Sequence, residues 1–203
     1  MINNNIVIIG YSGHSYGCIE VAIKQGYSIV GYHDILEKVS NPYSLKYLGY
    51  EENIKSGNKP FLAIGDNTIR EKIYQNLKSN GIYLNTSLIH SNTTISESSS
   101  IKEQTYISAG VIINPQVKID VGCIINTGAI IEHDCSIGKF THIAPGAVLA
   151  GNVLIGSGCL IGANAVIKQG IKIGDNVIVG AGAVVLKDIK SNATFVGNPA
   201  IEI

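Results

Sequence analysis

Two histidines in the second half of the sequence have the residue type and the neighbours that acid–base catalysis uses. His133 is followed directly by Asp134, and His142 lies nine residues further along the chain. Histidine titrates near neutral pH, and an adjacent carboxylate can orient or polarise its ring, so this pair could act as a general base. Two surface histidines without a catalytic role are the alternative interpretation, and the pattern alone does not decide between the two.

A metal site is not expected from the five histidines and four cysteines. None of them forms an HExxH motif, a Cys/His zinc spacing or a CxxC pair. Cys135 follows Asp134, but as a nucleophile it would give ping-pong kinetics, and a mechanism without a covalent intermediate is the preferred prediction. So few cysteines in a chain of this length favour reduced thiols and a cytoplasmic protein.

A second candidate site lies near the N-terminus, where a glycine-rich segment follows the apolar run IVIIG. The segment is Gly10-x-Ser12-Gly13-x-x-x-Gly17. A glycine turn that enters a helix can hold a phosphate on its backbone N–H groups. The segment departs from the dinucleotide fingerprint G-x-G-x-x-G, because Ser12 replaces the second glycine and the third is displaced. A nucleotide pyrophosphate site is therefore preferred over an NAD site, with a plain strand-to-helix turn as the alternative.

The elements around this glycine segment predict a small parallel α/β unit of the Rossmann-like type. Asp34 ends the second predicted strand, where it could meet a ribose or a base or simply form a turn. Asp66 or Asn67 can cap the second helix. In chain order the prediction is strand 6–10, helix 15–25, strand 27–33, an irregular segment 35–58, strand 61–65, helix 68–80 and strand 82–84.

The second part of the chain contains a six-residue repeat. Every sixth residue from Ile95 is Ile, Leu or Val: Ile95, Ile101, Ile107, Ile113, Ile119, Ile125, Ile131, Ile137, Ile143, Leu149, Ile155, Ile161, Ile167, Ile173, Val179 and Val185. This period matches neither a helix nor a simple strand. It predicts short strands joined by tight turns, with one aliphatic side chain per strand inside a narrow prism, and three repeats per coil give about five coils. Four residues after each anchor the side chain is mostly small or β-branched, which suits a corner and explains Cys123, Cys135 and Cys159 by packing.

Composition agrees with two unlike domains, 1–86 and 87–203. The first holds ten of the thirteen aromatic residues, whereas 15 basic and 15 acidic side chains give the whole chain zero net charge. A nucleic-acid partner is not expected without a basic surface. No apolar run approaches the length of a membrane span, and residues 1–5 do not begin a signal peptide, so neither membrane insertion nor export is expected.

Taken together, these motifs resemble bacterial nucleotide-sugar acetyltransferases of the hexapeptide-repeat, left-handed β-helix superfamily. The similarity is to the sialic-acid O-acetyltransferase-like family, and within it to the UDP-4-amino-sugar N-acetyltransferases of bacillosamine-type pathways. The residues that carry it are Gly10-Tyr11-Ser12-Gly13-His14, Ala63-Ile64-Gly65-Asp66-Asn67 with Ile69-Arg70, Ile125-Asn126-Thr127, Ile131-Glu132-His133-Asp134-Cys135, His142, Ala150-Gly151-Asn152-Val153, and Phe195-Val196-Gly197-Asn198-Pro199-Ala200.

The resemblance implies roles for particular residues. His133 would be the catalytic base, supported by Asp134, where the subgroup often has Glu. The nucleotide sugar would be bound by Gly10, Ser12, Gly13, His14, Asp34, Gly65, Asp66 and Asn126, and acetyl-CoA by His142, Gly151, Ala163 and Ala181. The resemblance also implies a homotrimer, with acetyl-CoA in the groove between two β-helices.

The function predicted from this resemblance is acetyl transfer from acetyl-CoA to the 4-amino group of a UDP-linked amino-deoxy sugar. Three alternatives stay open: O-acetylation of sialic acid or a related sugar, N-acetylation of a GDP-linked amino sugar, and a β-helix that binds without catalysing. The last is disfavoured because His133, Asp134, His142 and Asn126 occur in one region of the sequence.

Overall fold

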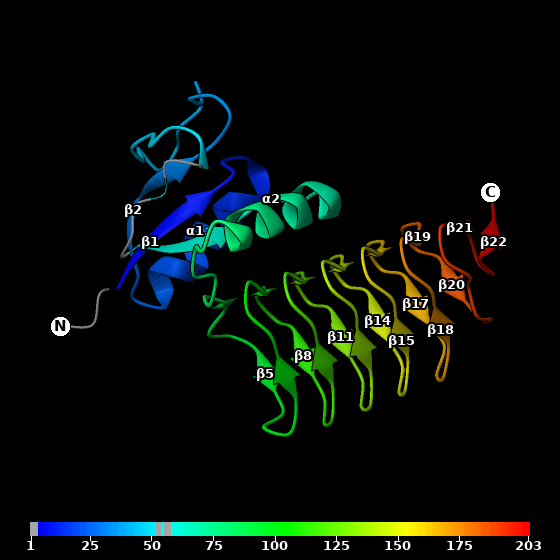
Figure 1. Cartoon of the computed structure of the whole chain (residues 1–203). Helices are drawn as coiled ribbons and strands as arrows, with labels where there is room; N and C mark the ends of the chain where they lie inside the picture. Colours follow the sequence, from blue (N-terminus) through cyan, green and yellow to red (C-terminus); the bar gives the residue numbers. More distant parts are fainter. Residues whose placement is uncertain (1–3, 52–53, 55–57) are drawn as a thin grey trace.

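The computed structural model of the chain describes residues 4–51, 54 and 58–203, which form an α/β unit followed by a β-helix (Figure 1). The predicted fold class is confirmed. The α/β unit comprises β1 (Asn5–Ile9), α1 (Gly13–Lys24), β2 (Ser28–His33), β3 (Lys59–Leu62) and α2 (Asn67–Ser79). Its three parallel strands are ordered β2-β1-β3, so β1 is central and nearly all of its side chains are buried.

Both predicted helices and three of the four predicted strands of this unit are present. Asp66 caps α2 by accepting a hydrogen bond from the Ile69 N–H at 2.8 Å, as one of the two predicted caps. The strand predicted at 82–84 is wrong. Its backbone instead closes the end of α2, where the Ile82 N–H donates to the Leu77 carbonyl, and the segment then leads into the first coil. The predicted irregular segment 35–58 extends partly outside the described residues.

The β-helix consists of three parallel sheets built from strands of two or three residues. The first sheet contains β4 (Leu88–Ile89), β7 (Tyr106–Ile107), β10 (Ile124–Ile125), β13 (His142–Ile143), β16 (Leu160–Ile161), β19 (Ile178–Val179), β21 (Thr194–Val196) and, antiparallel at the end, β22 (Ile201–Glu202). The second contains β5 (Thr94–Ile95), β8 (Ile112–Ile113), β11 (Ile130–Ile131), β14 (Val148–Leu149), β17 (Val166–Ile167) and β20 (Val184–Val185), and the third β6 (Ser100–Ile101), β9 (Lys118–Ile119), β12 (Ser136–Ile137), β15 (Leu154–Ile155) and β18 (Lys172–Ile173).

The repeat positions behave as the sequence predicts. Each anchor pairs with the anchor eighteen residues away, as Ile131 does with Leu149, and the anchors line one continuous core. The corner residues, among them the three repeat cysteines, are also buried there. The stack runs to about six turns rather than five, because Ile89 precedes the first predicted anchor and Phe195 extends the same sheet at the other end.

The two units are joined by close packing between α1 and the first sheet. A Cβ atom at Gly17 would lie 2.8 Å from the Tyr106 hydroxyl, so glycine in this helix allows the close approach. Apolar residues of α1, including Cys18 and Ile19, share a cluster with Leu88, Tyr106 and Ile124. A buried side chain, Gln104, adds two hydrogen bonds across the junction, to the Leu62 N–H and the Pro60 carbonyl.

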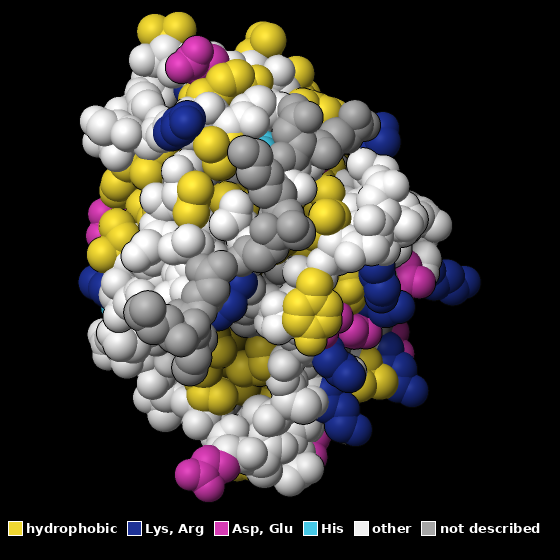
Figure 2. Space-filling model, turned by 60° about the vertical axis from the view of Figure 1, so that its left-hand side comes forward, with side chains coloured by type: hydrophobic (Ala, Val, Ile, Leu, Met, Phe, Trp, Pro, Cys, Tyr) yellow, Lys and Arg dark blue, Asp and Glu magenta, His cyan; other side chains and the backbone are white. Residues whose placement is uncertain are grey.

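The surface carries charges of both signs. On the face shown in Figure 2, Lys and Arg side chains lie among Asp and Glu side chains along one edge, with apolar side chains between them. With 15 basic and 15 acidic side chains in the whole chain, an anionic ligand is expected to be held by local groups rather than by a broad positive field. Within the described residues no helix has the length and apolar character needed to cross a membrane.

Candidate active site

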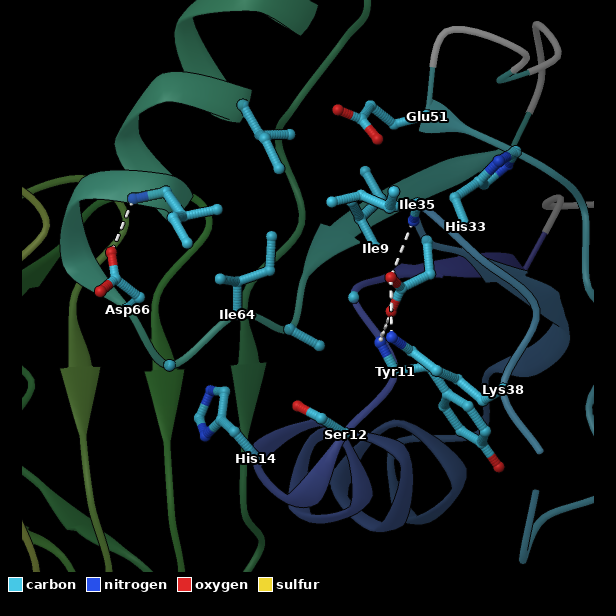
Figure 3. Close-up of a pocket in the computed structure, with 16 residues that line it drawn as sticks. Ile9, Tyr11, Ser12, His14, His33, Ile35, Lys38, Glu51, Ile64 and Asp66 are labelled. Atoms are coloured by element: carbon cyan, nitrogen blue, oxygen red, sulfur yellow. Dashed lines mark hydrogen bonds and ion pairs between the residues drawn. The ribbon is translucent and has the colours of Figure 1, made fainter. Parts of the chain in front are cut away.

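A pocket of about 400 Å³ opens at the carboxyl ends of the strands in the α/β unit (Figure 3). This is the edge at which ligands of parallel α/β sheets bind. Six of the eight predicted substrate-binding residues line it: Gly10, Ser12, His14, Asp34, Gly65 and Asp66. Gly13 and Asn126 are not among the lining residues. The pocket floor is apolar, with Ile9, Ile35 and Ile64 facing it.

The turn between β1 and α1 presents a helix N-terminus to this pocket. Gly10 has φ of +86°, and a Cβ there would lie 2.6 Å from Ile64, so glycine is required for both conformation and space. Ser12 is the N-cap of α1, and its N–H donates to Ser15 Oγ at 2.9 Å. The Ser15 N–H already donates to the Ser12 carbonyl at 2.9 Å, so the Gly13 and His14 N–H groups are the ones placed to bind an anion such as a diphosphate.

Two of the three acidic side chains in the pocket have structural roles. Asp34 accepts hydrogen bonds from the Tyr11 and Ile35 N–H groups and pairs with Lys38 at 3.0 Å. Asp66 is engaged as the cap of α2. The third, Glu51, is 4 % exposed and was not singled out from the sequence, because it lies in the irregular segment and belongs to no motif.

Where the two units meet, His142 of β13 lies beside Asn126. The Asn126 amide oxygen accepts from the Thr127 N–H at 2.8 Å, so its nitrogen is the group 3.3 Å from His142 Nε2. An amide nitrogen only donates, and His142 must therefore accept with an unprotonated Nε2. This arrangement requires the neutral form of His142.

Burial and neighbouring charges agree with that protonation state. Burial lowers the pKa of His142 to about 4, and the charges of Arg70 and then His14 act in the same direction. The pKa of His14 is also lowered to about 4, by burial and then by Arg70. The His14 ring also lies edge-on to the ring of Tyr106 in β7, with centroids 5.2 Å apart, so this end of the pocket lies next to the first sheet.

Arg70 is buried at this junction and makes no ion pair within the described part of the chain. Its guanidinium donates to the carbonyls of Ile64 and Gly65 in the pocket wall, at 2.9 and 3.1 Å, and to Asn67 Oδ1. It also donates to the Gly122 and Phe140 carbonyls of the β-helix, at 2.7 and 2.9 Å. One side chain thus joins the pocket to the coils that carry His142.

His133 and Asp134 occupy a different corner, between β11 and β12. Asp134 adopts φ of +62°, so its side chain turns back to His133, and Nδ1 lies 2.8 Å from Oδ2. A carboxylate only accepts, so Nδ1 carries a proton, and in the neutral ring Nε2 has the lone pair. That Nε2 lies over Gly151, where a Cβ atom would come within 2.5 Å of it. Within the described residues the Gly151 N–H donates no hydrogen bond.

The structure therefore separates the predicted residues into two groups. Asn126, Ala163 and Ala181 follow strands of the first sheet, at the edge where His142 lies, whereas His133 and Gly151 lie at the corner beyond the second sheet. One chain does not bring His133 to the pocket of the α/β unit. Among the described residues there is no cluster of three or more His, Cys, Asp or Glu side chains able to hold a metal ion.

Known proteins with the same architecture identify the family. Residues 5–77 match the PglD N-terminal domain, and residues 152–187 match the bacterial transferase hexapeptide repeats. The acetyltransferase domain of PglB from Neisseria gonorrhoeae FA1090 is 32 % identical, with a TM-score of 0.92 over 99 % of this chain and 100 % of that domain. PerB from Caulobacter crescentus is also 32 % identical, with a TM-score of 0.92 over 98 % of this chain and 97 % of PerB.

This chain belongs to the nucleotide-sugar acetyltransferases of the hexapeptide-repeat β-helix superfamily. WeeI from Acinetobacter baumannii AYE is a further structural relative of this acetyltransferase, at 26 % identity and a TM-score of 0.86 over 98 % of this chain and 100 % of that one. The PglB domain has been solved with acetyl coenzyme A, and PerB with CoA and GDP-perosamine. The resemblance to nucleotide-sugar acetyltransferases of this superfamily is thereby confirmed.

Proposed function

We propose that this acetyltransferase moves the acetyl group of acetyl-CoA to the 4-amino group of a nucleotide-linked amino-deoxy sugar. The observation that carries the proposal is the His133–Asp134 pair, whose Nε2 lies over Gly151, a residue whose N–H donates no hydrogen bond within the described residues. A base next to an oxyanion donor is the arrangement that acyl transfer needs. The ligands of the PglB domain and PerB support acetyl-CoA as the donor and an amino sugar as the acceptor.

In the proposed reaction the sugar amine attacks the thioester carbonyl carbon, forming a C–N bond. His133 Nε2 takes a proton from the attacking nitrogen, while Asp134 stabilises the resulting imidazolium through Nδ1. The Gly151 N–H would stabilise the negative charge that develops on the carbonyl oxygen. The C–S bond then breaks, and the proton passes from His133 to the leaving sulfur, giving CoA and the N-acetylated sugar. No enzyme group is acylated.

A homotrimer would bring the two separated groups of residues together. The outward side chains of the second sheet form an almost entirely apolar column: Thr94, Ile112, Ile130, Val148, Val166 and Val184. Apolar columns of this extent are typical of surfaces that contact a partner. If this sheet faces a second copy, His133 and Gly151 of one copy can approach His142 and the nucleotide pocket of another. Acetyl-CoA would then lie in the groove between them.

The acceptor is tested by measuring CoA release with a panel of UDP- and GDP-linked 4-amino sugars and with sialic acid. Turnover of a nucleotide-linked amino sugar, with acetylated nitrogen in the product, is expected. Turnover of sialic acid alone would instead establish the O-acetyltransferase alternative. The carrier nucleotide remains a prediction at this point: the sequence resemblance favours UDP, whereas PerB has been solved with GDP-perosamine.

A further inference from the structure

We propose that the pocket of the α/β unit selects a guanine base and that Glu51 is the residue that recognises it. This inference rests on the proposed function and refines its substrate to a guanosine-diphosphate sugar, in place of the uridine carrier that the sequence resemblance implies. It starts from one side chain, the only carboxylate of the pocket for which the described residues provide no partner.

Glu51 is buried yet unpaired. The residue is 4 % exposed, and it lines the pocket beside Ile35, Ile69 and Ile73. No hydrogen bond or ion pair to its carboxylate exists among residues 4–51, 54 and 58–203. Lys38 is the one Lys or Arg among the residues that line this pocket, and it pairs with Asp34. Lys72 lines an adjoining cavity together with Glu51, but no ion pair among the described residues joins the two. No fully buried side-chain oxygen among the described residues lacks a partner, so the accessible part of Glu51 includes its carboxylate, which can accept N–H groups from a ligand in the pocket.

The shape of the pocket indicates which part of the ligand meets Glu51. In Figure 3 its carboxylate points into the pocket from the end away from Ser12 and His14, with Ile9 and Ile35 between. A diphosphate at the N-terminus of α1 would leave the sugar near His14 and His142 and direct the nucleoside the other way. The isoleucine side chains then form apolar surfaces against which a flat base can lie, and Glu51 meets its edge.

The hydrogen-bonding groups on each base determine which base fits Glu51. Guanine presents two adjacent donors on one edge, N1–H and the N2 amino group, which match the two oxygens of a carboxylate. Uracil presents a single N–H between two carbonyl oxygens, and these would face the acceptor-only Glu51 unfavourably. Adenine and cytosine place a ring acceptor beside their amino group. Guanine is therefore the base whose hydrogen-bonding edge fits this carboxylate without leaving an acceptor against it.

Asp34 does not offer the same selection, although it lies at the end of β2, where nucleotide-binding folds often place a ribose ligand. Both of its oxygens are engaged, by the Tyr11 and Ile35 N–H groups and by Lys38. Glu51 could in principle meet ribose hydroxyls instead of the base. That role would not distinguish one nucleoside from another, so the two can be separated by experiment.

The test is calorimetric titration of the full-length protein with GDP and with UDP, in the wild type and in Glu51→Gln. GDP is expected to bind more tightly than UDP to the wild type, by about 5- to 150-fold for a good two-bond contact. Glu51→Gln should remove most of this preference, because an amide offers one acceptor and one donor. Glu37→Gln changes an exposed glutamate outside the pocket and should leave the preference intact.

Other results would overturn the inference. Tighter binding of UDP than of GDP to the wild type would contradict guanine selection whatever the variants do. Equal weakening of GDP and UDP in Glu51→Gln would assign Glu51 to the ribose. These outcomes are independent of the proposed function. If the enzyme binds and acetylates a UDP-linked amino sugar, only the guanine inference is contradicted. If GDP binding depends on Glu51 but no amino sugar is acetylated, only the proposed function is contradicted.

Discussion

At the scale of single residues, the hydrogen bond between His133 and Asp134 selects the tautomer of the neutral ring. Because the carboxylate accepts from Nδ1 at 2.8 Å, the lone pair of the neutral ring is on Nε2, which lies over Gly151. Both side chains are more than half exposed, at 53 % and 57 %, so substituting them removes little packing. Their proposed contribution is to the reaction rather than to stability.

His133→Asn is expected to lower kcat by about 10²- to 10⁴-fold, the usual contribution of a general base, with the melting temperature nearly unchanged. Asp134→Asn should lower kcat less, because the ring remains but loses its charged acceptor. Steady-state rates of CoA release and thermal melts measure both effects. Near-normal kcat in His133→Asn would exclude His133 as the base.

The lowered pKa values of His14 and His142 lead us to expect that stability depends on pH. Both pKa values are lowered to about 4 in the folded protein, so between pH 6.5 and about 4 the unfolded chain binds protons that the folded chain does not. The free energy of unfolding is therefore expected to fall as the pH decreases through this window. Urea unfolding at several pH values should show that the free energy of unfolding depends less steeply on pH in His142→Gln than in the wild type.

His133→Asn removes a histidine at the other corner and serves as the control. An equal slope of unfolding free energy against pH in all three proteins would contradict the prediction.

At the scale of elements, α2 and the segment before it connect the pocket to the β-helix through Arg70. Its guanidinium makes five hydrogen bonds, three to the segment 64–67 and two to the coils. Gln104 also crosses the junction, but its hydrogen bonds go to Pro60 and Leu62 and not to the pocket loop. Substituting each residue in turn can therefore distinguish an effect on the stability of the junction from an effect on the geometry of the pocket.

Arg70→Met leaves two carbonyls of the β-helix without their donor, at a cost of about 1–3 kcal/mol each. It should also raise KM for the nucleotide sugar, because the wall at Ile64 and Gly65 loses its link to the coils. Gln104→Met should destabilise the fold without changing KM. Denaturant unfolding and KM for both substrates give the comparison, and equal KM values in the two variants would show that Arg70 is only structural.

Periodicity allowed most elements to be predicted, because each one repeats a simple physical requirement. The six-residue spacing predicts the buried anchors, and an apolar run followed by glycine predicts β1 and the start of α1. The segment 82–84 is apolar enough for a strand, but it packs against α2 instead, because tertiary contacts determine its conformation. Glu51 and the junction role of Arg70 escaped prediction for the same reason: each depends on residues far away in the sequence.

At the scale of the whole molecule, the apolar column on the second sheet predicts how copies assemble. Val166 and Leu154 are almost equally exposed, at 39 % and 38 %, but Val166 belongs to the column and Leu154 to the third sheet, which also carries Lys118 and Lys172. The wild type is expected to have three times the 21.5 kDa mass of the chain. Val166→Lys should reduce this mass, because it would place an unpaired charge in an apolar interface.

Leu154→Lys is the matched control and should remain a trimer with normal activity. Light scattering after gel filtration measures the mass, and CoA release measures the dependence of activity on assembly. If Val166→Lys loses the trimer but keeps wild-type kcat, the active site is not shared between copies. A wild type that is monomeric at the assay concentration would contradict the trimer itself.

The left-handed backbone at Asp134 has a consequence for how this enzyme can evolve. The equivalent turns one coil earlier and later hold Gln116 and Asn152, with φ of +64° and +57°, and the turn after that has glycine at 170. Glycine and asparagine accept this conformation more readily than aspartate does. A single mutation can therefore delete the carboxylate and leave the scaffold at least as stable. Inactive descendants would persist as intact β-helices, so the repeat pattern by itself is no guarantee of a working acetyltransferase.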